Sequence, residues 1–233
     1  MHTLQAINLT KRYNGTVAVN NLNLQLEKGE IFCLLGQNGA GKTTTINLFL
    51  GFTETSSGKS LINGIEVLPG KSDTKKFIAY IPEVVQLYGN LTGIENLDFF
   101  SRLAGFKYSP EMLGGYLSRA GLQKEAHHGR LSTYSKGMRQ KVGIAIALAK
   151  NADVILMDEP TSGLDPKATA EFTAICKGLA AEGKTIFMAT HDIFNAVNVG
   201  TRIGIMKAGN LVHTMNASSI DASQLQSLYL ETV

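Results

Sequence analysis

The chain has 233 residues, of which 44% are hydrophobic and 18% charged, a balance typical of a folded globular protein rather than a disordered one. The 22 basic and 19 acidic residues leave a formal charge of +3, and without a long run of Lys and Arg this slight excess does not favour a nucleic-acid partner. Cys33 and Cys176 lie in apolar segments without CxxC or Cys/His spacing, which excludes a disulfide framework or a zinc site and fits buried thiols in a reducing compartment.

The first part of the chain predicts a layer of strands and then a buried strand. Residues 1–30 alternate between apolar and polar positions and are broken by Asn/Gly-rich turns, a pattern typical of antiparallel strands. Ile31–Leu35 is a continuous apolar run, which predicts a strand covered on both faces of a parallel sheet. A Gly-rich turn and a helical pattern follow it directly.

Further along, more segments predict strands of the same buried kind. These runs are Ile78–Ile81, Val154–Met157 and Thr185–Ala189. A last pair of strand-like segments, Arg202–Lys207 and Leu211–Met215, flanks Ala-Gly-Asn and predicts a hairpin. A short helix is expected over Ala222–Leu230.

Roughly residues 90–150 lack strand signals and carry amphipathic patterns at helical spacing. The patterns lie at Ile94–Ala104, Pro110–Ala120 and Lys136–Lys150. We therefore expect an α/β chain in which a helical lobe interrupts the sheet. The predicted division is one domain over 1–233, with a core lobe at about 1–87 and 152–233 and a helical lobe at about 88–151.

Gly36 to Thr43 reads GQNGAGKT and satisfies the spacing G-x-x-x-x-G-K-[ST]. Glycines suit this spacing because backbone amides must turn inward around phosphate groups, in conformations that side chains would block. Lys42 would place its charge on the β- and γ-phosphates, Thr43 would offer a hydroxyl to Mg²⁺, and the following helix would present its N-terminus. The residues predicted to bind nucleotide here are Gly36, Gln37, Asn38, Gly39, Ala40, Gly41, Lys42, Thr43 and Thr44.

An acidic pair follows one of the buried strands. Asp158 comes directly after Val154–Met157, and Glu159 follows it. A phosphate-binding loop of this kind needs a carboxylate at the end of a neighbouring strand for the Mg²⁺ shell, which predicts that role for Asp158. Glu159 would orient and deprotonate the attacking water. The pattern thus predicts hydrolysis of a nucleoside triphosphate.

With these motifs the chain resembles the ATPases of ABC (ATP-binding cassette) transporters over nearly its whole length. KRYNG resembles the family's aromatic loop, so Tyr13 would stack on adenine; TYSKGMRQKVG resembles the signature helix, which usually opens LSGGQ. TSGLDP and FMATHD resemble two further loops of the family. The resemblance implies that Asp165 lies near a subunit interface and His191 near the γ-phosphate. The resemblance implies a P-loop NTPase core of the RecA type, with an N-terminal antiparallel β-layer and an inserted α-helical subdomain, that hydrolyses ATP with Mg²⁺.

The resemblance also implies partners. Ser135 and Gly137 open a helix, so their hydroxyl and amides form an anion site, which in the family faces the γ-phosphate bound by the opposite subunit. We therefore expect a homodimer or a pair with a related ATPase subunit. No secretory signal and no membrane-length apolar stretch are found in the sequence, so a separate transmembrane permease is expected. The chain would be cytoplasmic and peripheral on the inner face of the cell membrane.

The chain departs from the family pattern in two places. Where the family usually has a Gln that senses Mg²⁺ and the γ-phosphate, the sequence offers Glu83 by position, with Gln86 three residues later, and the choice stays open. Lys136 replaces a Gly of the signature and adds a positive charge. YSKGM and the segment around Glu83 resemble the branch paired with exporter-type permeases. The alternative is an ABC-type ATPase outside transport, such as one in iron–sulfur cluster assembly.

Two adjacent histidines do not predict a metal site. His127 and His128 have no Cys or acidic ligand at suitable spacing. They are therefore expected to lie in a solvated loop.

Overall fold

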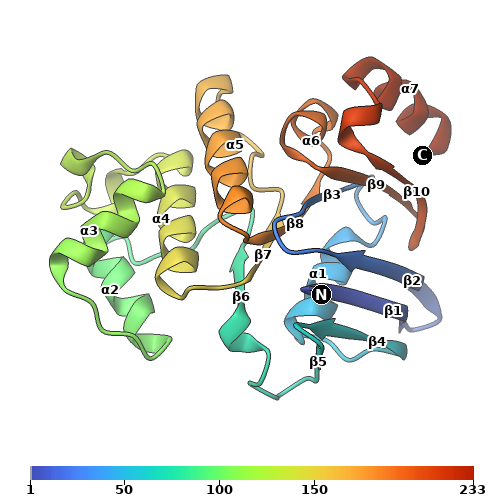
Figure 1. Cartoon of the computed structure of the whole chain (residues 1–233), viewed down its shortest axis with the longest axis horizontal. Helices are drawn as coiled ribbons and strands as arrows, with labels where there is room; N and C mark the ends of the chain where they lie inside the picture. Colours follow the sequence, from blue (N-terminus) through green and yellow to red (C-terminus); the bar gives the residue numbers. More distant parts are fainter. Residues whose placement is uncertain (1) are drawn as a thin grey trace.

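The structure is a computed structural model that describes residues 2–233. Within these residues the strands form a four-stranded sheet in the order β2-β1-β4-β5 and a six-stranded sheet in the order β10-β9-β3-β8-β7-β6 (Figure 1). The four-stranded sheet is antiparallel and consists of β1 (Leu4–Tyr13), β2 (Thr16–Leu26), β4 (Ser57–Ile62) and β5 (Ile65–Glu66). The antiparallel layer predicted for the N-terminus is therefore present, and it also includes two strands that sequence reasoning missed.

The six-stranded sheet carries all four predicted buried strands, three of them in its interior and Ile78–Ile81 at one edge. It is made of β3 (Ile31–Leu35), β6 (Ile78–Ile81), β7 (Val154–Asp158), β8 (Thr185–Thr190), β9 (Arg202–Lys207) and β10 (Asn210–Asn216). Strand β3 pairs in parallel with β8 and β9, and β7 pairs in parallel with β6 and β8, whereas β10 runs antiparallel to β9. The carboxyl ends of β3, β7 and β8 consequently meet at one edge of the sheet.

Helices cover both faces of this sheet, and a group of helices lies beside β6 at one end of it. Near the sheet lie α1 (Lys42–Leu50), α5 (Pro166–Ala181), α6 (Ile193–Val199) and α7 (Ala222–Thr232). The predicted helical lobe contains α2 (Gly93–Leu103), α3 (Pro110–Arg119) and α4 (Lys136–Ala149), which we call the helical layer. Figure 1 shows this layer beside β6, at the opposite end of the molecule from β10.

The starts of the helical layer follow from capping residues in the sequence. At α2 the side chain of Thr92 accepts a hydrogen bond from the amide of Glu95, whose carboxylate in turn accepts from the amide of Thr92. At α3 the cap is Ser109, followed by Pro110, whose fixed φ suits the first helical turn. These caps satisfy backbone donors that a helix otherwise leaves unpaired.

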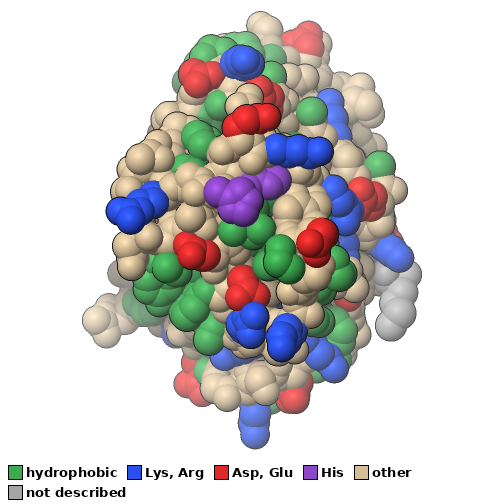
Figure 2. All heavy atoms as spheres, turned by 90° about the vertical axis from the view of Figure 1, so that its left-hand side faces the viewer, with side chains coloured by type: hydrophobic (Ala, Val, Ile, Leu, Met, Phe, Trp, Pro, Cys, Tyr) green, Lys and Arg blue, Asp and Glu red, His purple; other side chains and the backbone are tan. Residues whose placement is uncertain are grey.

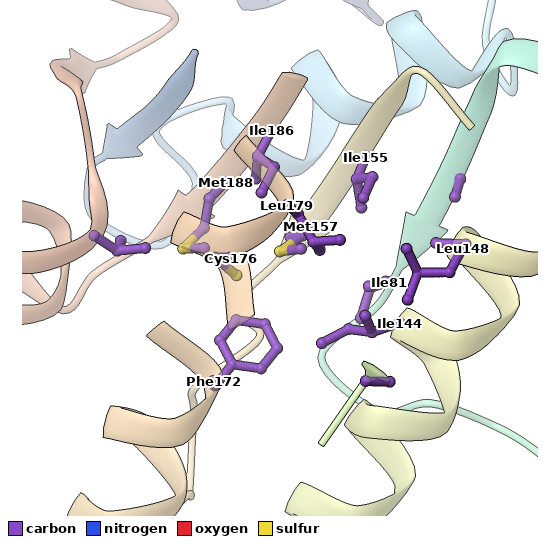
Figure 3. Packing of buried hydrophobic residues seen from close by; sticks show 14 of the residues in the cluster. Ile81, Ile144, Leu148, Ile155, Met157, Phe172, Cys176, Leu179, Ile186 and Met188 are labelled. Atoms are coloured by element: carbon purple, nitrogen blue, oxygen red, sulfur yellow. The ribbon is translucent and has the colours of Figure 1, made fainter. Parts of the chain in front are cut away.

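Hydrophobic side chains pack on both faces of the six-stranded sheet. On one face, Figure 3 shows Phe172, Cys176 and Leu179 of α5 against Met157 and Met188, and Ile144 and Leu148 of α4 near Ile81 and Ile155. On the other face, Phe187 stacks on Phe32 with ring centroids 5.8 Å apart and meets Phe49 of α1 edge to face at 5.6 Å. Burial of each such side chain contributes about 1.5–3 kcal/mol, so both faces hold α1, α4 and α5 in place around the sheet edge.

Figure 2 views the molecule from the helical layer, where side chains of both charges are interspersed with hydrophobic ones. One expectation for this region is wrong. His127 is only 6% exposed, and its Nε2 lies 3.1 Å from the carbonyl oxygen of Leu122, so the residue is a structural part of the layer. His128 is exposed as expected. Between residues 2 and 233, no helix combines the length and the hydrophobicity that a membrane span requires.

Candidate functional site

The loop between β3 and α1 can only be built with its glycines. Gly41 has φ 110°, and a Cβ on it would lie 2.3 Å from the carbonyl oxygen of Ala18. A Cβ on Gly36 would lie 2.6 Å from the carbonyl oxygen of Met206. Both distances are far below normal contact, so neighbouring strands press directly on the loop backbone. The loop backbone therefore packs closely against β2 and β9, and the loop also lines a cavity.

The Lys42 side chain is buried at the start of α1. Its Nζ donates to the carbonyl oxygen of Gly36 at 2.7 Å and lies 3.5 Å from a carboxylate oxygen of Glu159. A helix N-terminus and an ammonium at the same place favour an anionic ligand. The loop thus presents positive charge to the cavity beside it.

Glu159 leaves β7 in an unusual backbone conformation. Its φ is 46°, a region that side-chain-bearing residues rarely adopt, and its amide donates to the carbonyl oxygen of Ala189 at 2.8 Å. One carboxylate oxygen faces Lys42, and the other lies 2.8 Å from Nδ1 of His191 and accepts from the His191 amide at 3.2 Å. Two segments of the chain, at Lys42 and at His191, therefore hold this carboxylate.

A cavity of about 260 Å³ lies along this sheet edge. The residues that line it are Ala18, Gln37, Asn38, Gly39, Gly41, Lys42, Thr43, Thr44, Glu83, Asp158 and Glu159. The structure thus brings most of the predicted loop residues together with the acidic pair. It also places Glu83 in the lining, whereas Gln86 is exposed outside it.

Oxygen groups at the cavity suit a hard divalent cation. Burial raises the pKa of Asp158, and the nearby carboxylates of Glu159 and Glu83 raise it further, while a hydrogen bond from Thr43 and the charge of Lys42 oppose the shift. Negative charge is thus concentrated at a partly buried place, where a cation would stabilise it. Carboxylate and hydroxyl oxygens are the ligands that Mg²⁺ prefers, so the residues present fit this ion.

His191 belongs to a neighbouring cavity. This second cavity, of about 440 Å³, shares Glu159 with the first and is lined further by residues after β7 and β8, among them Ser162, Gly163 and His191. The His191 side chain is 62% exposed. It therefore reaches Glu159 from the solvent side, at the end of β8.

Tyr13 lies at the end of β1 and does not line the first cavity. Its ring is 43% exposed, its hydroxyl lies 3.4 Å from Oγ1 of Thr53, and Nζ of Lys11 lies 4.7 Å from the ring centroid. The ring is thus held at the surface of the antiparallel layer. Ala18, in the following strand β2, reaches the cavity, although sequence reasoning did not single it out.

The predicted signature residues lie at the start of α4. Ser135 caps this helix by accepting from the amide of Met138, and Asp165 caps α5 by accepting from the amide of Ala168. A Cβ on Gly137 would lie 3.5 Å from the Ala168 side chain, so the two helix starts pack together. Neither Ser135 nor Gly137 lines either cavity within this chain.

The comparisons with known proteins agree with this geometry. The family model described as ABC transporter matches residues 19–162. The chain belongs to this family. The α/β fold with an antiparallel layer and a P-loop core is confirmed by the structural relatives, and family membership implies an ATP-binding, ATP-hydrolysing domain.

Two similar proteins have names that refer to transport or to antibiotic resistance. The chain is 35% identical to the bacitracin transport ATP-binding protein BcrA of Enterococcus faecalis, over 94% of this chain and 71% of that protein. It is 32% identical to the linearmycin resistance ATP-binding protein LnrL of Bacillus subtilis, over 90% and 68%. It also superimposes on the dimeric structure of MJ0796, a bacterial ABC transporter cassette, with a TM-score of 0.80, 30% identity, and coverage of 92% and 98%.

Proposed function

We propose that this ABC-family chain hydrolyses ATP at the edge formed by β3, β7 and β8, and that hydrolysis powers a separate exporter-type permease. The observation that carries the proposal is the meeting of Lys42 with Glu159 and of Glu159 with His191 beside a glycine-built loop. This arrangement provides a phosphate-binding charge and a candidate base in one place.

The proposed roles follow from the positions of these groups. Lys42 and the amides from Gly36 to Thr44 would hold the phosphates. Glu159 would accept a proton from water as the water oxygen bonds to the γ-phosphorus and the bond to the bridging oxygen breaks. His191, which contacts the Glu159 carboxylate, would orient that carboxylate and approach the γ-phosphate. Tyr13 would stack on the adenine.

Thr43, Asp158 and Glu83 would hold Mg²⁺ beside the phosphates. When bound, this ion supplies charge neutralisation for the phosphate oxygens. The contribution of the chain is to supply these three oxygen groups in the cavity lining, with Asp158 partly buried and hydrogen-bonded to Thr43.

We further propose that two ATPase subunits close on each other, either two copies or this chain and a related one. Ser135 and Gly137, with Asp165 at the neighbouring helix start, would face the nucleotide of the opposite subunit. This arrangement would explain why the start of α4 lines neither cavity of its own chain. The dimeric structure described for MJ0796 supports it. The division into a core lobe and a helical lobe belongs to the same proposal.

The exporter role is supported by the transport and resistance names of BcrA and LnrL. The chain would then work at the inner face of the cell membrane with a membrane-spanning partner. The test is to isolate the chain with its natural partners from native membranes and identify them by mass spectrometry. A polytopic membrane protein is the expected partner. Recovery of a scaffold protein of iron–sulfur assembly instead would contradict the transport role. It would not contradict the proposed ATP hydrolysis.

A further inference from the structure

The start of α4 is joined to the segment after β6 by contacts that the ATPase proposal does not use. Nζ of Lys136 lies 3.8 Å from Oε1 of Glu83, and the hydroxyl of Ser162 donates to the same oxygen at 2.9 Å. Glu83 also lines the nucleotide cavity. Glu83 therefore lines the cavity while its carboxylate contacts both the helical layer and the turn that follows Glu159.

The backbone beside Glu83 is held by the same helix. Gln140, which is 1% exposed, donates through Nε2 to the carbonyl oxygens of Pro82 at 3.3 Å and Glu83 at 3.1 Å. Lys136 and Gln140 are four positions apart and so share a face of α4. The helix thus contacts this segment twice, once through the backbone and once through the carboxylate.

Lys136 occupies a position where a cation is otherwise unfavourable. It is the first residue of α4, and the N-terminal end of a helix carries partial positive charge that repels a lysine. The Glu83 carboxylate compensates for this repulsion. The two departures from the family pattern, a Glu in place of Gln and a Lys in place of Gly, therefore lie against each other as a matched pair.

The turn that carries Ser162 closes this arrangement. Its amide donates to the carbonyl oxygen of Glu159 at 3.1 Å, and a Cβ on the next residue, Gly163, would lie 3.8 Å from Nζ of Lys136. A shift of α4 would therefore act on Glu83 directly and on the turn after Glu159 at the same time.

We propose that Lys136 is a positioning residue. Its ammonium, together with the Ser162 hydroxyl, holds the Glu83 carboxylate at the boundary with α4. The helical layer thereby controls how strongly this carboxylate contributes to binding of a divalent cation with nucleotide. The contact between α4 and Glu83 stands without the ATPase proposal, whereas its effect on cation binding rests on it. Glu83 and Lys136 are 52% and 33% exposed at their side chains, so the pair can separate without leaving a buried charge.

The test is a double-mutant cycle read by equilibrium binding of ADP with and without Mg²⁺. Lys136→Met releases the carboxylate and is expected to strengthen the Mg²⁺-dependent part of ADP binding about two- to fivefold, as suits an exposed ion pair. In the Glu83→Gln background the same substitution is expected to have no effect. Lys136→Arg, which keeps the charge, should behave as the wild type.

Lys141→Met is the matched control. Lys141 lies on the same helix and pairs with Glu171 at 2.6 Å, and neither residue lines the nucleotide cavity, so this change should leave the Mg²⁺ dependence unaltered. Equal effects of Lys136→Met in both backgrounds, weaker binding, or no effect would overturn the proposal.

Failure of the ATPase proposal would look different. If no variant binds ADP, the same cycle is read by urea unfolding. A coupling between the two substitutions would then support the contact between α4 and Glu83, and strictly additive effects would overturn it.

Discussion

Two lysine–carboxylate pairs at the same cavity differ in how they are built. Lys42 and Glu159 are 6% and 15% exposed at their side chains; Glu159 directly follows β7, and Lys42 begins α1 after the glycine loop. Lys136 and Glu83 are 33% and 52% exposed and join the helical layer to a loop. The first pair is fixed by backbone that the sheet holds in place. The second depends on two side chains and can rearrange, so we expect the first to govern chemistry and the second to adjust it.

The same contrast applies to the two regions that carry the pairs. At the sheet edge the backbone itself is constrained, with Gly41 pressed on Ala18 and Glu159 in a rare conformation. The helical layer packs against the sheet through apolar side chains such as Ile144, and near the cavity it adds polar contacts through Gln140 and Lys136. Substitutions at the edge should therefore have larger effects than substitutions in the layer.

The largest effect is expected at Glu159. Glu159→Gln removes the proposed base but keeps the shape of the side chain, so ATP turnover should fall by roughly 10²–10⁴-fold, while nucleotide still binds. The measurement is phosphate release beside equilibrium nucleotide binding. Glu182→Gln, at an exposed residue paired with Arg119, is the control and should turn over normally. Turnover in Glu159→Gln close to that of the wild type would remove Glu159 from its assigned role.

Lys42→Met should weaken nucleotide binding. A hydrogen bond to a charged group contributes about 1.5–3 kcal/mol, so the dissociation constant should rise roughly ten- to hundredfold. Calorimetric titration with ADP measures it. Lys124→Met, at an exposed lysine away from the cavity, should leave affinity unchanged, and equal affinities for the two variants would contradict the placement of phosphate at Lys42.

Gly41→Ala tests the backbone of the sheet edge. The new Cβ would meet the carbonyl oxygen of Ala18 at a residue with φ 110°, so the free energy of unfolding should fall by about 1–3 kcal/mol. Gly178→Ala is the matched control because it lies within α5 with no atom within 4 Å of the added Cβ. That change should raise stability by about 0.4–1 kcal/mol. Urea unfolding compares them, and an unchanged midpoint for Gly41→Ala would argue against the close approach.

The smallest effect is expected beside the helical layer, at Tyr108 in the loop between α2 and α3. Its hydroxyl donates to the carbonyl oxygen of Ala149 at 2.6 Å, and burial raises the pKa of Tyr108 from 10.0 to about 12. Because the unfolded chain loses this proton first, the stabilisation is complete below pH 10 and is lost as the pH rises towards 12. Tyr108→Phe should lower stability at pH 7 by about 0.5–1.5 kcal/mol and flatten the loss above pH 10.

Urea midpoints of the wild type and Tyr108→Phe measured from pH 8 to pH 11.5 check this dependence. Parallel curves for the two proteins would show that Tyr108 does not carry it.

The sequence predicted the residues at the sheet edge better than the contacts between Glu83 and the helical layer. Ile31–Leu35 and Val154–Met157 are continuous apolar runs that end directly at the loop and at the acidic pair, so local pattern alone locates them. Strand β4 was missed because its first three residues are exposed and its pattern is short. Helices α5 and α6 were not predicted as elements either, although Asp165 and Asp192 cap them.

Local sequence patterns could not predict contacts between residues that are far apart in the chain. Ser162 and Glu83 are 79 positions apart, and Gln140 and Glu83 are 57 apart, so only the packing of α4 beside β6 brings them together. Likewise, nothing in the local pattern around His127 signals its burial. The turn that directs the Glu159 carboxylate towards Lys42 imposes the positive φ of Glu159. The sequence motif predicts the chemical role of this carboxylate but not its backbone conformation.

We expect a nucleotide bound at the glycine-built loop to be closed over by the start of α4 from a second ATPase subunit. Sedimentation velocity of the purified Glu159→Gln variant, which should bind ATP without consuming it, tests this most directly. With Mg²⁺ and ATP the variant is predicted to sediment as a dimer, and with ADP or without nucleotide as a monomer. A sedimentation coefficient that is the same with Mg²⁺ and ATP, with ADP and without nucleotide, although binding of ATP and ADP is measured, would contradict this closure.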